Sequence, residues 1–154
     1  MASSIKTEGH YVLKTNLLKE KHENVKRYCK NVDITDREFI SIAVRDCIKK
    51  KLSRKDTIEL FCQYSGLSYN AIHRIVKHDY TKVYIDGLIE TVIDGIRQEI
   101  IYQSYVVKPS HYQTKIDGNS GKVRQIGIQD VKQQLYDYIA AYGLWELFTA
   151  KIGY

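Results

Sequence analysis

The chain has 154 residues, of which 44% are hydrophobic and 27% are charged, and it carries a formal net charge of +6. This length suits one domain with a real core, and the hydrophobic content excludes an intrinsically disordered chain. A single proline in the whole sequence leaves room for long helices. We therefore expect a mainly α fold whose basic surface favours polyanions such as nucleic acids.

The cysteines and the apolar runs indicate the compartment. Cys29, Cys47 and Cys62 form no Cys-x-x-Cys pair, so we expect free thiols and neither a disulfide framework nor a cysteine zinc site. No apolar run approaches the roughly 18 residues of a membrane span, and the first residues lack the apolar segment of a signal peptide. These features predict a cytoplasmic protein without a membrane partner.

Two helices are expected at the N-terminal end. After a loose start, apolar residues recur among basic ones over residues 10–30, which is typical of a charged amphipathic helix. Thr35 and Glu38 have the spacing of a capping box and predict a helix from there to about Leu52. Lysines 49–51 would complement the dipole in its last turn, with a phosphate contact as the alternative.

A helix-turn-helix-like unit is expected over residues 54–78. Ser53 and Ser68 are the predicted caps of two helices, over residues 54–64 and 69–77, and Gly66 lies at the turn between them. Any pair of helices joined by a glycine turn shows much of this pattern. Five outward-facing side chains of the second helix are suited to base edges or phosphates: Tyr69, Asn70, His73, Arg74 and Lys77.

A long helix over residues 82–105, capped by Thr81, completes a helical N-terminal region that spans residues 1–105. Gly87 and Gly95 fall inside this helix and predict close packing of a neighbouring helix there. Its expected core positions are Val83, Leu88, Ile89, Val92, Ile93, Ile96 and Ile100.

The hydrophobic period changes after Tyr105, and residues 106–154 form the second predicted region. Residues 112–116 and 122–128 are expected to be strands, joined by the turn sequence Asp-Gly-Asn-Ser-Gly into a β-hairpin. An amphipathic helix over residues 129–151 follows. The hairpin carries cations on both strands, which either grip phosphate or simply protect exposed strand edges: Lys115, Lys122 and Arg124.

Residues 108–154 resemble the opening segment of bacterial reverse transcriptases of the group II intron, retron and prophage kind. The resemblance lies in the first strand, the Asp-Gly turn, the strand Lys-Val-Arg-Gln-Ile-Gly-Ile at 122–128, and Gln133 in the helix that follows. It implies that this region is the fingers subdomain, whose hairpin folds over the incoming nucleotide. By this resemblance Arg124 contacts the triphosphate, Lys115 is a second phosphate contact, and Lys122 touches template or phosphate.

The sequence departs from this family at two points. The family often has proline where Gln125 stands, and its palm carries a Tyr-x-Asp-Asp turn that holds Mg²⁺, whereas this sequence has no Asp-Asp pair. We therefore expect an N-terminal fragment of an RNA-directed DNA polymerase that is not catalytic alone. In this interpretation the chain has no catalytic residue, metal ligand or cofactor of its own, and Mg²⁺ and dNTP belong to the full-length enzyme.

The same resemblance suggests partners and leaves two alternatives. Residues 1–105 would grip template RNA or an RNA–DNA duplex, and the C-terminal helix, with Trp145 and Phe148, would pack on the palm. The alternatives are a helix-turn-helix DNA-binding regulator that uses residues 58–76, and a helical module that binds another protein through the same aromatics.

Overall fold

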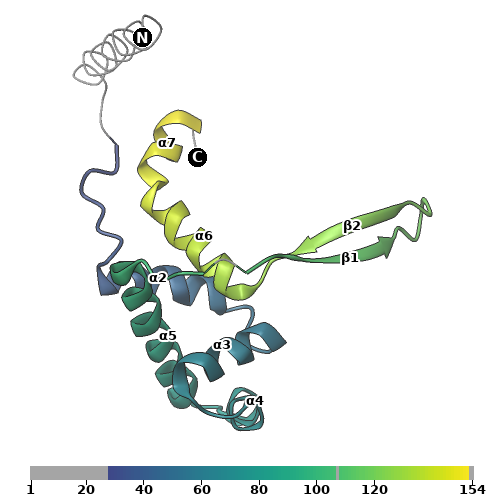
Figure 1. Ribbon diagram of the computed structural model, residues 1–154, viewed down its shortest axis with the longest axis horizontal. Coiled ribbons are helices and arrows are strands. Elements are labelled where there is room, and N and C mark those ends of the chain that lie inside the picture. The colour runs from purple at the N-terminus through teal and green to yellow at the C-terminus, as the bar shows by residue number, and fades with distance from the viewer. Residues whose placement is uncertain (1–27, 107, 153–154) are drawn as a thin grey trace, which may run out of the picture. The chain divides into compact units, whose positions relative to one another are not determined.

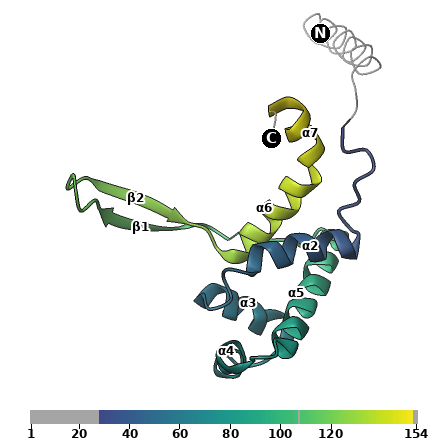
Figure 2. The same ribbon diagram turned by 180° about the vertical axis from the view of Figure 1, so that it is seen from behind.

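The computed structural model describes residues 28–106 and 108–152 (Figures 1 and 2). The chain divides into two units, residues 1–30 and 31–154, and the described helices and strands belong to the second. The predicted helix over residues 10–30 lies outside the described residues, apart from its last three. In chain order the elements are α2 (Arg37–Ile48), α3 (Lys55–Ser65), α4 (Tyr69–His78), α5 (Val83–Tyr102), β1 (His111–Ile116), β2 (Val123–Ile128), α6 (Val131–Gly143) and α7 (Trp145–Ile152).

The predicted fold class is confirmed, because the described residues are mainly helical, with one antiparallel hairpin and helix at the C-terminal end. In the described part of the chain no helix is both long enough and apolar enough to cross a membrane. Within the described residues, Cys29, Cys47 and Cys62 form no disulfide.

The core lies where α2, α3, α5 and α6 meet. α5 packs against α2, α3 and α4, while α6 packs against α2 and α3. Helices from both sides of the predicted 105/106 boundary therefore contribute to one core. Val83, predicted as a core residue, is instead 66% exposed in the first turn of α5. The fully buried side chains include Ile40, Val44, Ile48, Ile58, Phe61, Ile72, Val92, Ile93, Ile96, Val131 and Leu135.

The predicted caps of α2 and α3 are wrong. Asp36 is the N-cap of α2 and accepts a hydrogen bond from the Phe39 amide, because Asp33 already binds the amide and hydroxyl of Thr35. Arg54, not Ser53, occupies the N-cap of α3, and no side chain caps it. The adjacent Asp56 carboxylate instead accepts from the Thr57 amide, so it satisfies one of the free donors of the first turn.

Two helix ends also differ from the prediction. α2 ends at Ile48, so lysines 49–51 follow the helix instead of forming its last turn. The amide of Lys51 binds the Ile48 carbonyl and that of Arg54 binds the Lys51 carbonyl, which turns the chain toward α3. α5 begins at Val83 after Lys82, whose φ of 59° is left-handed, and ends at Tyr102 before Gln103, also left-handed. Thr81 is therefore not its N-cap.

The turn between α3 and α4 is confirmed in detail. Gly66 ends α3 with a φ of 73°, a left-handed conformation that glycine adopts without steric cost. The Ser68 hydroxyl caps α4 by accepting from the Ala71 amide. Ile72 is fully buried and Ile75 is half-buried, so α4 turns its apolar stripe inward as predicted.

The predicted helix over residues 129–151 is two helices. α6 starts after Asp130, whose carboxylate accepts from the Lys132 amide, and stops at Gly143. A Cβ at Gly143 would lie 3.8–3.9 Å from side chains of Val32, Ile34 and Phe39. Glycine is a poor helix former, so it weakens the helix where the chain passes these side chains. α7 then carries no buried residue.

Candidate nucleic-acid interface

The hairpin places two cations directly opposite each other. β1 and β2 pair antiparallel, with Lys115 opposite Arg124. Directly opposed residues of a pair share one face of the sheet, so both side chains project from the same side. Like charges in this position repel and weaken the pairing. The hairpin therefore places two cations on one face, an arrangement that favours a bound anion.

Arg124 has one weak protein partner, and it comes from the turn. Its Nη2 lies 3.6 Å from a carboxylate oxygen of Asp117, and the Arg124 side chain is 66% exposed. Asp117 also accepts from the Ser120 hydroxyl at 3.0 Å and the Asn119 amide at 3.3 Å. An exposed ion pair of this kind contributes at most about 1 kcal/mol. Asp117 thus leaves the guanidinium available to a ligand.

Lys115 and Lys122 carry no ion pair within the described residues. Lys122 directly precedes β2, and its carbonyl accepts from the Asp117 amide at 2.9 Å. The structure therefore brings the three predicted phosphate-binding residues to one hairpin end, with Lys115 and Arg124 on a common face. Every residue of this end is exposed apart from Asp117, which is half-buried.

The other face of the hairpin carries an apolar pair at each end, with the polar pair Thr114–Gln125 between them. Tyr112 and Gly127 are opposed, and a Cβ at Gly127 would lie 3.3 Å from the Tyr112 ring. Ile116 and Val123 form the next apolar pair on this face and are 72% and 67% exposed. A two-stranded ribbon without a packed face is marginal in water. The hairpin extends away from the helices in both views (Figures 1 and 2), so this face has no cover among the described residues.

The root of the hairpin is tied to the helical core. Arg54 binds Asp56 through two nitrogens, at 2.6 and 3.0 Å. Asp56 also accepts from the Val131 amide at 2.9 Å, which joins the start of α3 to the start of α6. A recess of about 420 Å³ opens beside this joint, and His111 and Gln113 of the hairpin line it. The base of the hairpin is therefore held by charged hydrogen bonds although its tip is free.

A buried polar cluster, which sequence reasoning missed, lies behind this joint. Glu99 of α5 binds the Lys132 ammonium at 2.8 Å and accepts hydrogen bonds from the hydroxyls of Tyr64 and Tyr136, at 2.7 and 2.6 Å. The side chains of Lys132 and Glu99 are only 10% and 17% exposed. Burial alone would raise the pKa of Glu99, but these three hydrogen bonds outweigh it and lower that pKa. The cluster fixes α6 on α3 and α5.

Gln133, one of the residues that carry the resemblance, is hydrogen-bonded beside the Glu99 cluster. Its side-chain oxygen accepts a hydrogen bond from the Tyr105 hydroxyl, and the Tyr105 and Tyr136 rings lie 3.8 Å apart between centroids. Gln133 therefore links the end of the α5 segment to α6, beside the Glu99 cluster.

The second group of predicted residues lies on α4. All five side chains are exposed, and the rings of Tyr69 and His73 stack with centroids 6.2 Å apart. This group and the hairpin cations lie on separate elements (Figures 1 and 2). Within the described residues, neither Arg74 nor Lys77 makes an ion pair. Both cations are free to meet an anionic ligand.

The aromatic residues of the C-terminal helix differ in exposure. Trp145 is 54% exposed and, with Phe39, Ile42 and Tyr142, lines a mostly apolar groove of about 490 Å³. Phe148 is half-buried. Over residues 28–106 and 108–152, no group of three or more histidine, cysteine or acidic side chains is arranged to hold a metal ion.

No protein-family model, no curated protein and no solved structure matches this chain.

Proposed function

We propose that the chain is the N-terminal and fingers region of a bacterial, cytoplasmic RNA-directed DNA polymerase. In this role it binds template nucleic acid and the phosphates of the incoming nucleotide, and it does not polymerise alone. The observation that carries the proposal is the Lys115–Arg124 pair, two like charges held opposite each other at the exposed end of a hairpin. Such a pair costs stability in the free protein and favours an anionic ligand.

In this proposal the root of the hairpin stays fixed while its strands move. The hairpin root is held by Arg54, Asp56 and the start of α6, whereas its strands lack a packed face. A ribbon of this kind can close over a nucleotide while its base keeps its position. Arg124 would grip the triphosphate, Lys115 a second phosphate oxygen, and Lys122 template or phosphate. Mg²⁺ would be bound by carboxylates of the palm, on which the exposed face around Trp145 would pack.

The first prediction concerns the charge on the hairpin. Arg124→Gln should weaken binding of a labelled structured RNA and reduce the slope of log affinity against log salt by about one. The reason is that each phosphate contact releases counterions from the nucleic acid. Fluorescence anisotropy at four or five KCl concentrations measures both quantities.

The matched control removes one positive charge elsewhere. Lys55→Gln changes a lysine that is 79% exposed on α3 and pairs with Glu59. Its salt slope should equal that of the unchanged protein. The proposal is contradicted if the unchanged protein binds RNA with no dependence on salt, or if Arg124→Gln has no more effect than Lys55→Gln.

A helix-turn-helix regulator is the second candidate, and the exposed face of α4 after the Gly66 turn favours it. It requires preference for one duplex DNA sequence, because base edges in the major groove carry that information. Replacing both Arg74 and Lys77 with alanine would then abolish duplex binding, while Arg124→Gln would leave it intact. The opposite pattern supports the polymerase proposal.

A further inference from the structure

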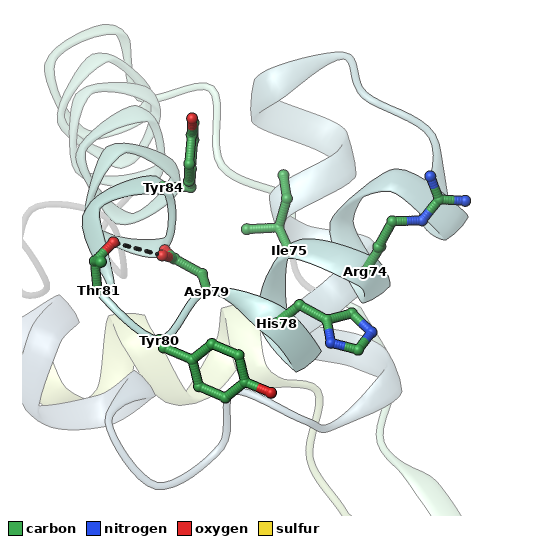
Figure 3. Close-up of a pocket in the computed structure, with 7 residues that line it drawn as sticks. All are labelled: Arg74, Ile75, His78, Asp79, Tyr80, Thr81 and Tyr84. Carbon is green, nitrogen blue, oxygen red and sulfur yellow. Dashed lines mark hydrogen bonds between the residues drawn. The ribbon is translucent and has the colours of Figure 1, made fainter.

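A hollow of about 410 Å³ lies between the end of α4 and the start of α5. Figure 3 shows its lining: Ile75 lies in the middle, Arg74 and His78 come from α4, and Tyr80, Thr81 and Tyr84 come from the turn and from α5. Its volume is within the range of about 300–1,000 Å³ that is usual for small-ligand sites. The hollow is separate from the hairpin, and it shares Arg74 with the outward face of α4.

Two tyrosines line this hollow and leave most of their surface exposed. Tyr80 is 88% exposed and Tyr84 is 69% exposed. Neither hydroxyl makes a hydrogen bond within the part of the chain that the structure describes. By contrast, the hydroxyls of Tyr64, Tyr136 and Tyr142 all bind carboxylates inside the protein. Large exposed rings without partners are suited to stacking on a ligand.

The turn that presents these rings is firmly built. The Asp79 carboxylate accepts from the Thr81 hydroxyl at 2.9 Å and from the Ile85 amide at 2.9 Å. Lys82, at the end of this turn, has a φ of 59°, a left-handed conformation that residues with a side chain disfavour. The backbone that carries the two tyrosines is therefore fixed by this turn.

The charged groups at the hollow are the Arg74 guanidinium and the Asp79 carboxylate. Asp79, its only carboxylate, is occupied by hydrogen bonds of the turn. Arg74 has no acidic partner within the described residues, and His78 is exposed beside it. An apolar floor at Ile75, two aromatic rings and a free guanidinium are the groups that recognise a base together with its phosphate.

We propose that this hollow binds an unpaired nucleotide of a single-stranded nucleic acid. Tyr80 and Tyr84 stack on its base, and Arg74 and His78 hold its phosphate. The strand must be unpaired, because bases inside a duplex are already stacked on their neighbours and offer no free face. The inference rests on the proposed function for the identity of the strand, which is then the template RNA.

The test uses the full chain and two labelled probes, a 12-nucleotide oligouridine and a blunt 12-base-pair RNA duplex. The unchanged protein should bind the single strand more tightly than the duplex. Replacing Tyr80 and Tyr84 with alanine should weaken single-strand binding roughly fivefold to 100-fold, the range expected for loss of stacking. The salt slope should not change, because no charge is removed.

Tyr102→Ala is the matched control, since Tyr102 is 76% exposed at the far end of the same helix. It should leave affinity within about twofold, as a surface substitution away from the site does. Phenylalanine at positions 80 and 84 should preserve binding because the rings remain. Oligothymidine in place of oligouridine tells whether the strand is read as RNA or DNA.

The inference is overturned if the alanine variant binds the single strand like the unchanged protein, or if it loses duplex binding equally. Measuring Arg124→Gln in the same assay distinguishes failure of the hollow as a binding site from failure of the proposed function. If the tyrosine variant binds with unchanged affinity while Arg124→Gln reduces the salt slope, the nucleotide site in the hollow is contradicted and the hairpin site is supported. If the tyrosine variant loses affinity while Arg124→Gln leaves the salt slope unchanged, the hairpin site is contradicted and the hollow is supported.

Discussion

Lys132→Met should lower the free energy of unfolding by about 3 kcal/mol, near the lower end of the cost of breaking a buried ion pair. Lys132 binds Glu99 at 2.8 Å in a site where both side chains are largely hidden from water. Methionine fills a similar volume but leaves the carboxylate buried with only its two tyrosine partners. For a chain of this size we expect a melting point about 10 °C lower. Calorimetry or thermal circular dichroism measures it.

Lys55→Met is the control for this substitution, because Lys55 is 79% exposed in a pair with Glu59. Its effect should stay within about 0.5 kcal/mol. Equal melting points for the Lys132 and Lys55 variants would show that the buried cluster does not hold α6 on α3 and α5.

The Glu99 pKa adds an acid-dependent signature to the same experiment. Its lowered pKa means that the carboxylate is more stable as an anion in the folded protein than in the unfolded chain. This contribution is fully present above the ordinary value of 4.5 and is lost as pH falls through the lower folded pKa. Since Lys132 provides a hydrogen bond to the carboxylate, the Lys132→Met variant should lose less stability than the unchanged protein over that acid range.

Gly95→Ala should destabilise the protein by about 2 kcal/mol, the usual cost of overpacking. A Cβ at this position would lie 2.2 Å from the Tyr64 ring, well inside contact distance. Tyr64 cannot simply turn away, because its hydroxyl binds Glu99. The added methyl group on α5 therefore strains Tyr64 and its hydrogen bond to Glu99 in the buried cluster. Urea unfolding of the variant measures the loss.

Gly87→Ala supplies the matched comparison on the same helix. Nothing lies within 4 Å of a Cβ at Gly87. Gly87→Ala should therefore stabilise the protein by about 1 kcal/mol, because alanine favours the helix and meets no clash. Opposite signs for the two substitutions are the expected result. A stabilising Gly95→Ala would contradict the close approach of Tyr64.

Much of the fold could be predicted from local patterns. The Gly66 turn, the Ser68 cap and the exposed face of α4 all follow from short-range signals that agree with one another. The hairpin follows equally from its turn sequence and its alternating strands, and its register then brings Lys115 opposite Arg124. Close packing at a helical glycine was predicted at both positions and holds at Gly95, whereas Gly87 faces open space.

The remaining features depend on tertiary contacts that local patterns do not carry. Lys132 and Glu99 are 33 residues apart, and each by itself looks like an ordinary surface charge. Asp36 caps α2 in place of the predicted Thr35, whose amide and hydroxyl both bind Asp33. The hollow beside Tyr80 is formed where the end of α4 meets the turn and the start of α5. None of these contacts leaves a periodic signal in the sequence.

The most direct test of the central claim is a titration of the ¹⁵N-labelled chain with dATP and with inorganic tripolyphosphate, followed by the amide chemical shifts. Because the phosphates are the proposed ligand, both compounds should shift the amides of residues 113–126, and Arg124→Gln should remove most of that change. Hairpin amides that stay unmoved by both compounds, while the folded protein remains intact, would contradict a nucleotide-phosphate site on the hairpin.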